Sequence, residues 1–261
     1  MRADLYLTAR CLAESRAKAQ SAINEGRLFV NGKNIKKCAF DVSDTDTVEL
    51  KGDGLRYVSR GGLKLLGAIE AFGIDVTGLT AVDIGASTGG FTDCLLQHGA
   101  KKVYAVDCGR DQLHTRLKDD SRVVSIEGFN ARELTEGTLG EKCDVAVMDV
   151  SFISQTLLYG AVRRTVREGG LFVSLIKPQF EAGRSAIGRG GIVKDRKTHV
   201  SVIKKVLTNA TESGLFPLGI DVSPIEGGDG NTEYLALFKV GTPTGTVITD
   251  SFIKELTTQK I

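Results

Sequence analysis

One local pattern repeats from Gly61 onward: a short apolar run, a glycine-containing turn and an amphipathic stretch. The apolar runs read TAVDIG, KVYAVD, VVSIEG, DVAVMDV, GGLFVSLIKP, LFPLGIDVSP and EYLALFKV. Strands that alternate with helical stretches predict an α/β fold, with a mostly parallel sheet covered by helices on both faces. Glycine supplies 31 of the 261 residues and proline only 4, which suits several tight turns between strands and helices.

The first 37 residues differ in character because they hold eight Lys and Arg residues against three acids. They predict a short helix ending near Leu12, a second helix capped by Ser15, and a hairpin at Asn31-Gly32. Such a cationic unit can neutralise phosphates, although an ordinary solvated surface is the simpler interpretation of any charge run. We expect RNA contacts from Arg10, Arg16, Lys18, Arg27, Lys33, Lys36 and Lys37.

The stretch SRAKAQSAINEGRLFVNGK resembles the RNA-binding domain named after the fourth protein of the small ribosomal subunit. That resemblance implies a small α+β domain whose helix pair and following loop grip structured RNA. A closing strand in DTVEL and a glycine-containing hinge near residues 51–58 come next. We therefore expect an RNA-binding domain over residues 1–55, a linker over 56–60 and a larger domain over 61–261.

The first apolar run of the larger domain leads into a glycine-rich loop, Asp83-Ile84-Gly85-Ala86-Ser87-Thr88-Gly89-Gly90-Phe91. A loop of this kind after a strand is a typical ligand site. The dinucleotide pattern G-x-G-x-x-G fits poorly because Ser87 stands at its second glycine. The hydrolase pattern G-x-S-x-G is present, but none of the three histidines lies in a recognisable strand-end setting.

S-adenosylmethionine suits the loop better, since this ligand carries a sulfonium and no phosphate. It needs a tight glycine turn, and carboxylates for its cationic amino-acid end and its ribose. Asp83 precedes the turn, Asp107 ends the next strand, and Asn130 after the third strand could flank the adenine. We expect cofactor contacts from Asp83, Gly85, Ala86, Ser87, Gly89, Gly90, Phe91, Asp107, Asn130 and Asp149.

Methyl transfer from a sulfonium depends on positioning and on a reactive acceptor. Enzymes that methylate amino groups commonly carry an Asp/Asn-Pro-Pro-aromatic loop after the fourth strand, whereas this chain has Asp149-Val150-Ser151-Phe152. A nitrogen acceptor is therefore disfavoured. Lys177 ends the next apolar run, and Pro178 favours an extended backbone there, so the lysine should face the site. Lys64 and Glu233 complete a set of two lysines and two acids, the help that a weakly acidic alcohol needs.

The segments SRGGLKL, DIGASTGGFTDCLL, MDVSFIS, IKPQFEAG and GNTEY, in this order, resemble the TlyA family of ribosomal RNA 2′-O-methyltransferases, historically labelled haemolysins. The resemblance covers nearly the whole chain. It implies a Rossmann-like class I methyltransferase domain that uses S-adenosylmethionine and acts on ribosomal RNA of a ribosomal subunit, at the ribose of a cytidine. The related FtsJ enzymes use a Lys-Asp-Lys-Glu tetrad, and the matching positions are Lys64, Asp149, Lys177 and Glu233.

The resemblance implies that Lys177 contacts the ribose 2′-hydroxyl and, when neutral, accepts its proton, while Asp149 and Glu233 orient the lysines. Burial and the charge of Lys64 would favour a neutral Lys177, whereas the carboxylates would favour its charged form. The sequence leaves open whether Lys177 is a base or only polarises the hydroxyl. For each lysine alone, a structural salt bridge is the simpler interpretation. Only the joint placement of the two lysines favours a catalytic role.

A second basic tract lies at residues 183–205. Its loop-like part predicts that Arg184 and Arg189 hold RNA near the site, although Lys204 and Lys205 also fit the wet side of a helix. Arg60 is a further candidate for RNA contact, and it could instead serve the hinge.

Several classes of protein are disfavoured by composition. No apolar stretch reaches the length of a spanning helix, and the N-terminal segment lacks a signal-type apolar region. The five cysteines form no Cys-x-x-Cys pair, and no histidine has a partner at metal-ligand spacing, so we expect a cytoplasmic protein without disulfides or metal. Two alternatives remain: a membrane-lysing protein, and a non-catalytic ribosome-binding factor with a dead methyltransferase fold. Nothing in the sequence indicates the oligomeric state.

Overall fold

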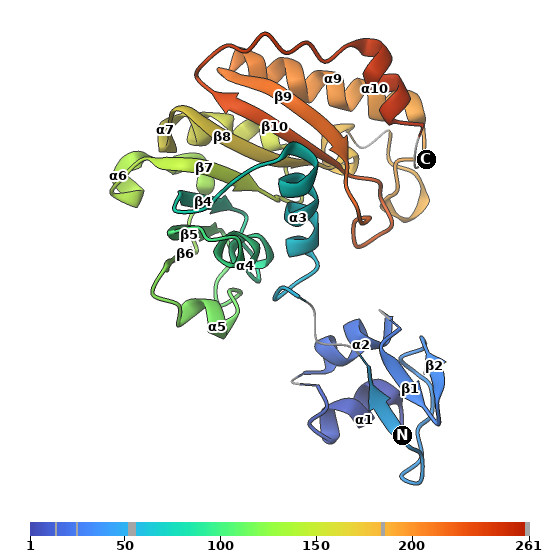
Figure 1. The fold of residues 1–261 in the computed structure, drawn as a ribbon. Helices are drawn as coiled ribbons and strands as arrows, with labels where there is room; N and C mark the ends of the chain where they lie inside the picture. Colours follow the sequence, from blue (N-terminus) through green and yellow to red (C-terminus); the bar gives the residue numbers. More distant parts are fainter. Residues whose placement is uncertain (14, 25, 52–55, 184–185, 259–261) are drawn as a thin grey trace. The chain divides into compact units, whose positions relative to one another are not determined.

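The computed structural model describes residues 1–13, 15–24, 26–51, 56–183 and 186–258. The chain divides into two compact units, Met1–Arg56 and Tyr57–Ile261 (Figure 1). Each unit has a hydrophobic core of its own.

The first unit contains two helices and a small antiparallel sheet of order β2-β1-β3. Its elements are α1 (Ala3–Ala9), α2 (Arg16–Asn24), β1 (Leu28–Val30), β2 (Lys33–Ile35) and β3 (Val48–Leu50). The predicted cap and hairpin are confirmed: Ser15 Oγ accepts a hydrogen bond from the Lys18 amide at 3.3 Å, and Asn31 and Gly32 turn with φ of 50° and 77°. The first helix ends earlier than predicted, because Cys11 takes a left-handed φ of 55°.

The second unit is built on a seven-stranded sheet of order β6-β5-β4-β7-β8-β10-β9. Its strands are β4 (Thr80–Ile84), β5 (Lys102–Asp107), β6 (Val123–Glu127), β7 (Cys143–Met148), β8 (Val166–Ile176), β9 (Leu215–Val222) and β10 (Tyr234–Val240). The first five strands run parallel, and β10 pairs antiparallel with β8 and β9. The chain runs outward from β4 to β6 and returns to β7, so the carboxyl end of β4 is a topological switch point, where α/β proteins bind ligands.

Helices cover both faces of this sheet, as the alternating pattern predicted. The helices are α3 (Gly61–Phe72), α4 (Gly90–Gln97), α5 (Thr115–Lys118), α6 (Glu136–Leu139), α7 (Tyr159–Thr165), α8 (Pro178–Glu181), α9 (Arg196–Glu212) and α10 (Asp250–Leu256). The short 3₁₀ turns are η1 (Ala131–Glu133), η2 (Gln155–Leu158) and η4 (Arg189–Gly191). On β8, Val173 and Leu175 pack in the core that contains α3 and α4, whereas Phe172 and Ile176 pack in the core that contains α7 and α9.

The structure also bears on the predictions about the cysteines and about membrane-spanning helices. The five cysteines all lie within the described residues and are free thiols. In the part of the chain that the structure describes, no helix is long and apolar enough to cross a membrane.

Candidate active site

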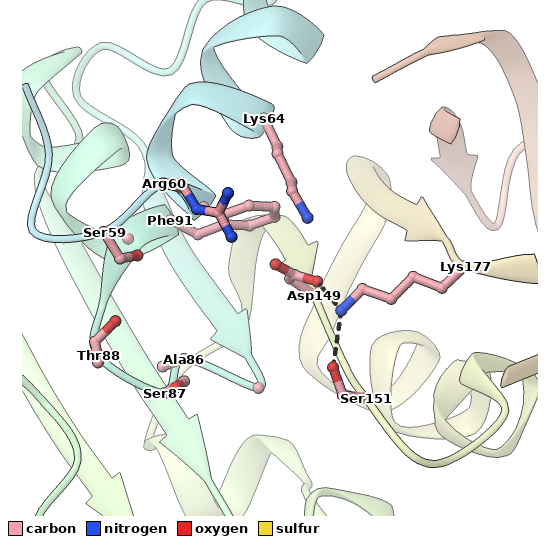
Figure 2. Close-up of a pocket in the computed structure, with 13 residues that line it drawn as sticks. Ser59, Arg60, Lys64, Ala86, Ser87, Thr88, Phe91, Asp149, Ser151 and Lys177 are labelled. Carbon is pink, nitrogen blue, oxygen red and sulfur yellow. Dashed lines mark hydrogen bonds and ion pairs between the residues drawn. The ribbon is translucent and has the colours of Figure 1, made fainter. Parts of the chain in front are cut away.

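A pocket of about 290 Å³ opens at the carboxyl ends of β4, β7 and β8 (Figure 2). It joins the glycine-rich loop to three of the four charged residues of the predicted catalytic set, Lys64, Asp149 and Lys177. The lining residues are Ser59, Arg60, Gly61, Lys64, Gly85, Ala86, Ser87, Thr88, Gly90, Phe91, Asp149, Ser151 and Lys177.

The glycine-rich loop is a strained turn that connects β4 to α4. Gly85, Ser87 and Gly89 all have positive φ, of 85°, 48° and 92°. A Cβ on Gly85 would lie 3.0 Å from the Asp149 carbonyl oxygen, so glycine allows the loop to pass close to the segment after β7. The Gly85 amide donates to the Val106 carbonyl at 2.9 Å, which ties the loop to β5 and leaves its far side open to the pocket.

Asp83 lies beneath this loop rather than in the pocket wall. Its side chain is fully buried, and Oδ2 accepts hydrogen bonds from the Thr92 amide at 3.0 Å and the Thr92 hydroxyl at 2.7 Å. Oδ1 has no hydrogen-bond partner among the described residues. Burial raises the Asp83 pKa to about 7, against the lowering effect of the Thr92 hydrogen bonds, and the nearby charge of Asp149 raises it further.

The side chains of Asp107 and Asn130 also accept hydrogen bonds from backbone amides of the protein. Asp107 Oδ2 accepts from the Ser87 amide at 2.8 Å, and Oδ1 accepts from the Gly109 amide at 2.7 Å. Asn130 is exposed and caps η1 by accepting from the Arg132 amide at 3.2 Å. Neither residue lines the pocket, so their predicted contacts with ribose and adenine stay predictions.

The four charged residues form two ion pairs. Lys64 Nζ lies 2.5 Å from Glu233 Oε2, and Lys177 Nζ lies 2.6 Å from Asp149 Oδ1. Lys64 is on α3, Asp149 follows β7, Lys177 follows β8, and Glu233 precedes β10. Figure 2 shows Lys64 and Lys177 extending from different elements toward Asp149. The fold thus gathers side chains that are far apart in the sequence around one end of the pocket.

Two neutral side chains that the sequence reasoning missed complete these pairs. Ser151 Oγ accepts a hydrogen bond from Lys177 Nζ at 2.9 Å, and Gln179 Nε2 donates to Glu233 Oε1 at 3.4 Å. Each lies two residues after a member of the charged set, and both positions follow strand ends. That spacing is the signal that could have identified them.

The loop after β7 exposes an aromatic ring beside the charged pairs. Phe152 is 90% exposed and has a left-handed φ of 66°, which is unusual for a bulky residue. Its ring centroid lies 5.2 Å from that of Phe180, which follows Lys177 by three residues. An exposed ring held by a strained backbone next to a polar pocket is typical of a ligand-contacting position.

Arg60, Arg184 and Arg189 are the predicted RNA-contacting arginines beyond residues 1–55. Arg60 lines the pocket at the start of α3, next to Ser59. Arg184 lies outside the described residues. Arg189 begins η4.

The predicted RNA-binding residues of the first unit are mostly exposed, and Arg27 is half-buried. Arg10 Nη2 pairs with Asp44 at 2.8 Å. Arg16 Nε pairs with the buried Asp4 carboxylate at 3.0 Å, and Arg2, which the sequence reasoning missed, binds the same carboxylate at 3.0 Å. Hydrogen bonds from Arg2 and Gln20 hold the pKa of Asp4 well below its usual range.

Both units match known protein families. Residues 57–240 match the FtsJ-like methyltransferase family, and residues 1–48 match the S4 domain. Hemolysin A of Brachyspira hyodysenteriae is 44% identical over 239 residues, which cover 91% of this chain and 99% of that protein. The 16S/23S rRNA (cytidine-2′-O)-methyltransferase TlyA of Mycobacterium tuberculosis is 41% identical over 242 residues, which cover 92% of this chain and 90% of that protein.

Solved structures agree with this assignment. A Streptococcus thermophilus chain described as a hemolysin superposes with a TM-score of 0.79 at 42% identity, covering 100% of this chain and 95% of that one. A Pyrococcus horikoshii chain described as an RNA methyltransferase superposes with a TM-score of 0.51 at 18% identity, covering 71% of this chain and 86% of that one. The second match supports the fold alone.

Proposed function

The chain belongs to the TlyA family of FtsJ-like methyltransferases, and from this premise we propose that it transfers a methyl group from S-adenosylmethionine to a ribose 2′-hydroxyl of ribosomal RNA. The observation that carries the proposal is the position of the Lys64–Glu233 and Lys177–Asp149 ion pairs at a pocket formed by the glycine-rich loop. The names of the relatives favour cytidine as the target nucleoside.

The pocket residues fit S-adenosylmethionine, which when bound supplies an electrophilic methyl group on a cationic sulfur. The loop of Gly85 to Phe91 offers small residues and open backbone at a switch point, which suits a close-fitting ligand. Asp83 lies beneath the loop with one unpartnered buried oxygen among the described residues, and Asp149 lines the wall. Carboxylates of this kind favour a cationic ligand over a phosphate.

The charged residues then act on the acceptor. Lys177 binds the 2′-oxygen, and in its neutral form it takes the hydroxyl proton as the oxygen–methyl bond forms and the sulfur–methyl bond breaks, with its electron pair left on the sulfur. Asp149 stabilises the resulting ammonium, while the Lys64–Glu233 pair keeps a second cation beside the reacting oxygen. The proton finally passes from Lys177 to water, which restores the enzyme.

RNA is held through the aromatic and basic residues. The exposed ring of Phe152, beside Phe180, can stack on the nucleobase of a nucleotide turned out of its helix. Arg60 in the pocket wall is placed to bind a backbone phosphate. The S4 domain supplies a separate cationic unit for structured RNA.

One assay separates the proposed function from its alternatives. The protein is incubated with labelled S-adenosylmethionine and each ribosomal subunit, and the RNA is digested to nucleosides. We expect label in a 2′-O-methylated nucleoside, and loss of that label in Lys177→Ala while calorimetry still detects cofactor binding. A protein that binds subunits without transferring label would be a non-catalytic factor, and lysis of erythrocytes by Lys177→Ala would support a membrane-active protein instead.

A further inference from the structure

We propose that Ser151 is a positioning residue for Lys177, and that its hydroxyl fixes the direction in which Lys177 faces the acceptor oxygen. This inference rests on the proposed function and concerns the same site. It begins from the 2.9 Å hydrogen bond between Lys177 Nζ and Ser151 Oγ, drawn in Figure 2.

The three protons of an ammonium explain why this contact matters. In the resting site, Lys177 Nζ forms an ion pair with Asp149 Oδ1 at 2.6 Å and donates a hydrogen bond to Ser151 Oγ at 2.9 Å. These two contacts together restrict where Nζ lies and where its remaining N–H groups point. With Asp149 alone, the flexible lysine side chain could rotate about a single ion pair, so the serine converts one anchor into two.

The backbone around Ser151 is held firmly enough to serve this purpose. At one end, β7 and Asp149 fix the loop to the sheet. At the other end, the buried Glu181 carboxylate accepts from the Ser154 hydroxyl at 2.6 Å and from the Gln155 amide at 2.8 Å. Because Glu181 lies on α8, directly after Lys177, the same short segment positions both the lysine and its serine partner.

The effect of Ser151 on turnover distinguishes a positioning role from a structural one. Because the hydroxyl accepts a hydrogen bond from Lys177, its loss should act on turnover through the orientation of the lysine. Ser151 is exposed and lines the pocket, so the fold does not depend on its burial. Loss of the hydroxyl should therefore change turnover and leave the affinity for S-adenosylmethionine unchanged.

The test uses the full chain and two nearly isosteric variants, Ser151→Thr, which keeps a hydroxyl, and Ser151→Val, which lacks one. Ser151→Ala provides a third measurement, and Ser125→Ala on the exposed edge strand β6 is the control. We expect Ser151→Val and Ser151→Ala to lower kcat by about tenfold or more, with the KM for RNA and the Kd for S-adenosylmethionine within about twofold of the parent. Ser151→Thr should recover most of the turnover.

Other results would contradict either the role of Ser151 or the proposed function. Equal turnover of Ser151→Thr and Ser151→Val would overturn the role of Ser151, as would a loss of cofactor affinity parallel to the loss of turnover. No methyl transfer by the unaltered protein would instead overturn the proposed function. Circular dichroism of each variant shows that reduced turnover does not come from unfolding.

Discussion

Lys64 and Glu233 are 169 residues apart in the chain, yet Nζ of the lysine lies 2.5 Å from Oε2 of the glutamate. The side chains are only 10% and 2% exposed, so water screens the pair little. The lysine comes from α3 and the glutamate from the residue before β10, so the ion pair joins a helix on one face to the entry of a strand near the edge of the sheet. Each charge is stabilised mainly by the other.

Removal of one member of this pair should be more harmful to folding than removal of both. Glu233→Ala leaves Lys64 buried without a carboxylate, and breaking a buried pair in this way typically costs about 3–5 kcal/mol. The double variant Lys64→Met with Glu233→Leu removes both charges and should recover a large part of that loss without recovering methyl transfer. Urea unfolding followed by circular dichroism measures the free energies, and equal stability of the single and double variants would contradict the mutual dependence.

The fold was predictable because each strand of the large sheet corresponds to a separate apolar run in the sequence. All seven runs form strands of the large sheet, and the helix expected to carry Lys204 and Lys205 is α9, with the Asp195 side chain accepting from the Thr198 amide as its cap. Both faces of the sheet are covered, so every residue of β4 is buried. With no exposed face, the sequence gives no alternation from which to tell which way Asp83 points, and its position beneath the loop could not be predicted.

The candidate site was partly predictable for a similar reason. Carboxyl ends of parallel strands meet at one edge, so Asp149 and Lys177 could be placed together from the order of the strands. Side chains in irregular segments could not be placed, because their direction depends on backbone angles that no periodic pattern encodes. Phe152, with its φ of 66°, and Ser151 beside it are the clearest cases.

The exposed ring of Phe152 provides a test of RNA contact that is independent of folding. Phe152→Ala removes little buried surface, so the melting temperature should stay within about 2 °C of the parent. Stacking of a base on an aromatic ring contributes about 1–3 kcal/mol, so kcat/KM for RNA should fall by roughly 5- to 150-fold. Methylation kinetics measure this, with Phe252→Ala, an exposed ring on α10, as the matched control. An equal loss in the control would argue against a specific contact.

The buried Asp83 should make stability depend on pH. Its folded pKa of about 7 is above its ordinary 3.8, so the folded state holds this proton more tightly than the unfolded state does. The stability that the protonated acid contributes is therefore complete below about pH 4 and is lost as pH rises to about 7. Asp83→Asn cannot ionise, so its melting temperature relative to the parent should rise by about 4 °C or more between pH 5 and pH 8.

Differential scanning fluorimetry at half-unit pH steps measures this difference. Asp75→Asn is a suitable control because Asp75 is exposed, and hydrogen bonds from Thr77 lower rather than raise its pKa. The control should show no gain between pH 5 and pH 8. A constant difference between Asp83→Asn and the parent over this range would contradict a folded pKa of about 7 for Asp83.

The buried carboxylate of Asp4 leads to a prediction about RNA affinity that is opposite to the one expected from net charge alone. It binds Arg2 and Arg16, each at 3.0 Å, and so holds two guanidinium groups in fixed positions at the surface of the first unit. Asp4→Asn makes the protein more positive but frees both arginines, so we expect RNA affinity to fall by about fivefold or more. Asp44→Asn adds the same charge at the exposed Arg10 pair and should leave affinity equal or slightly higher. Fluorescence anisotropy with a ribosomal RNA fragment, at several salt concentrations, measures both, and equally tighter binding by the two variants would show that net charge alone governs this surface.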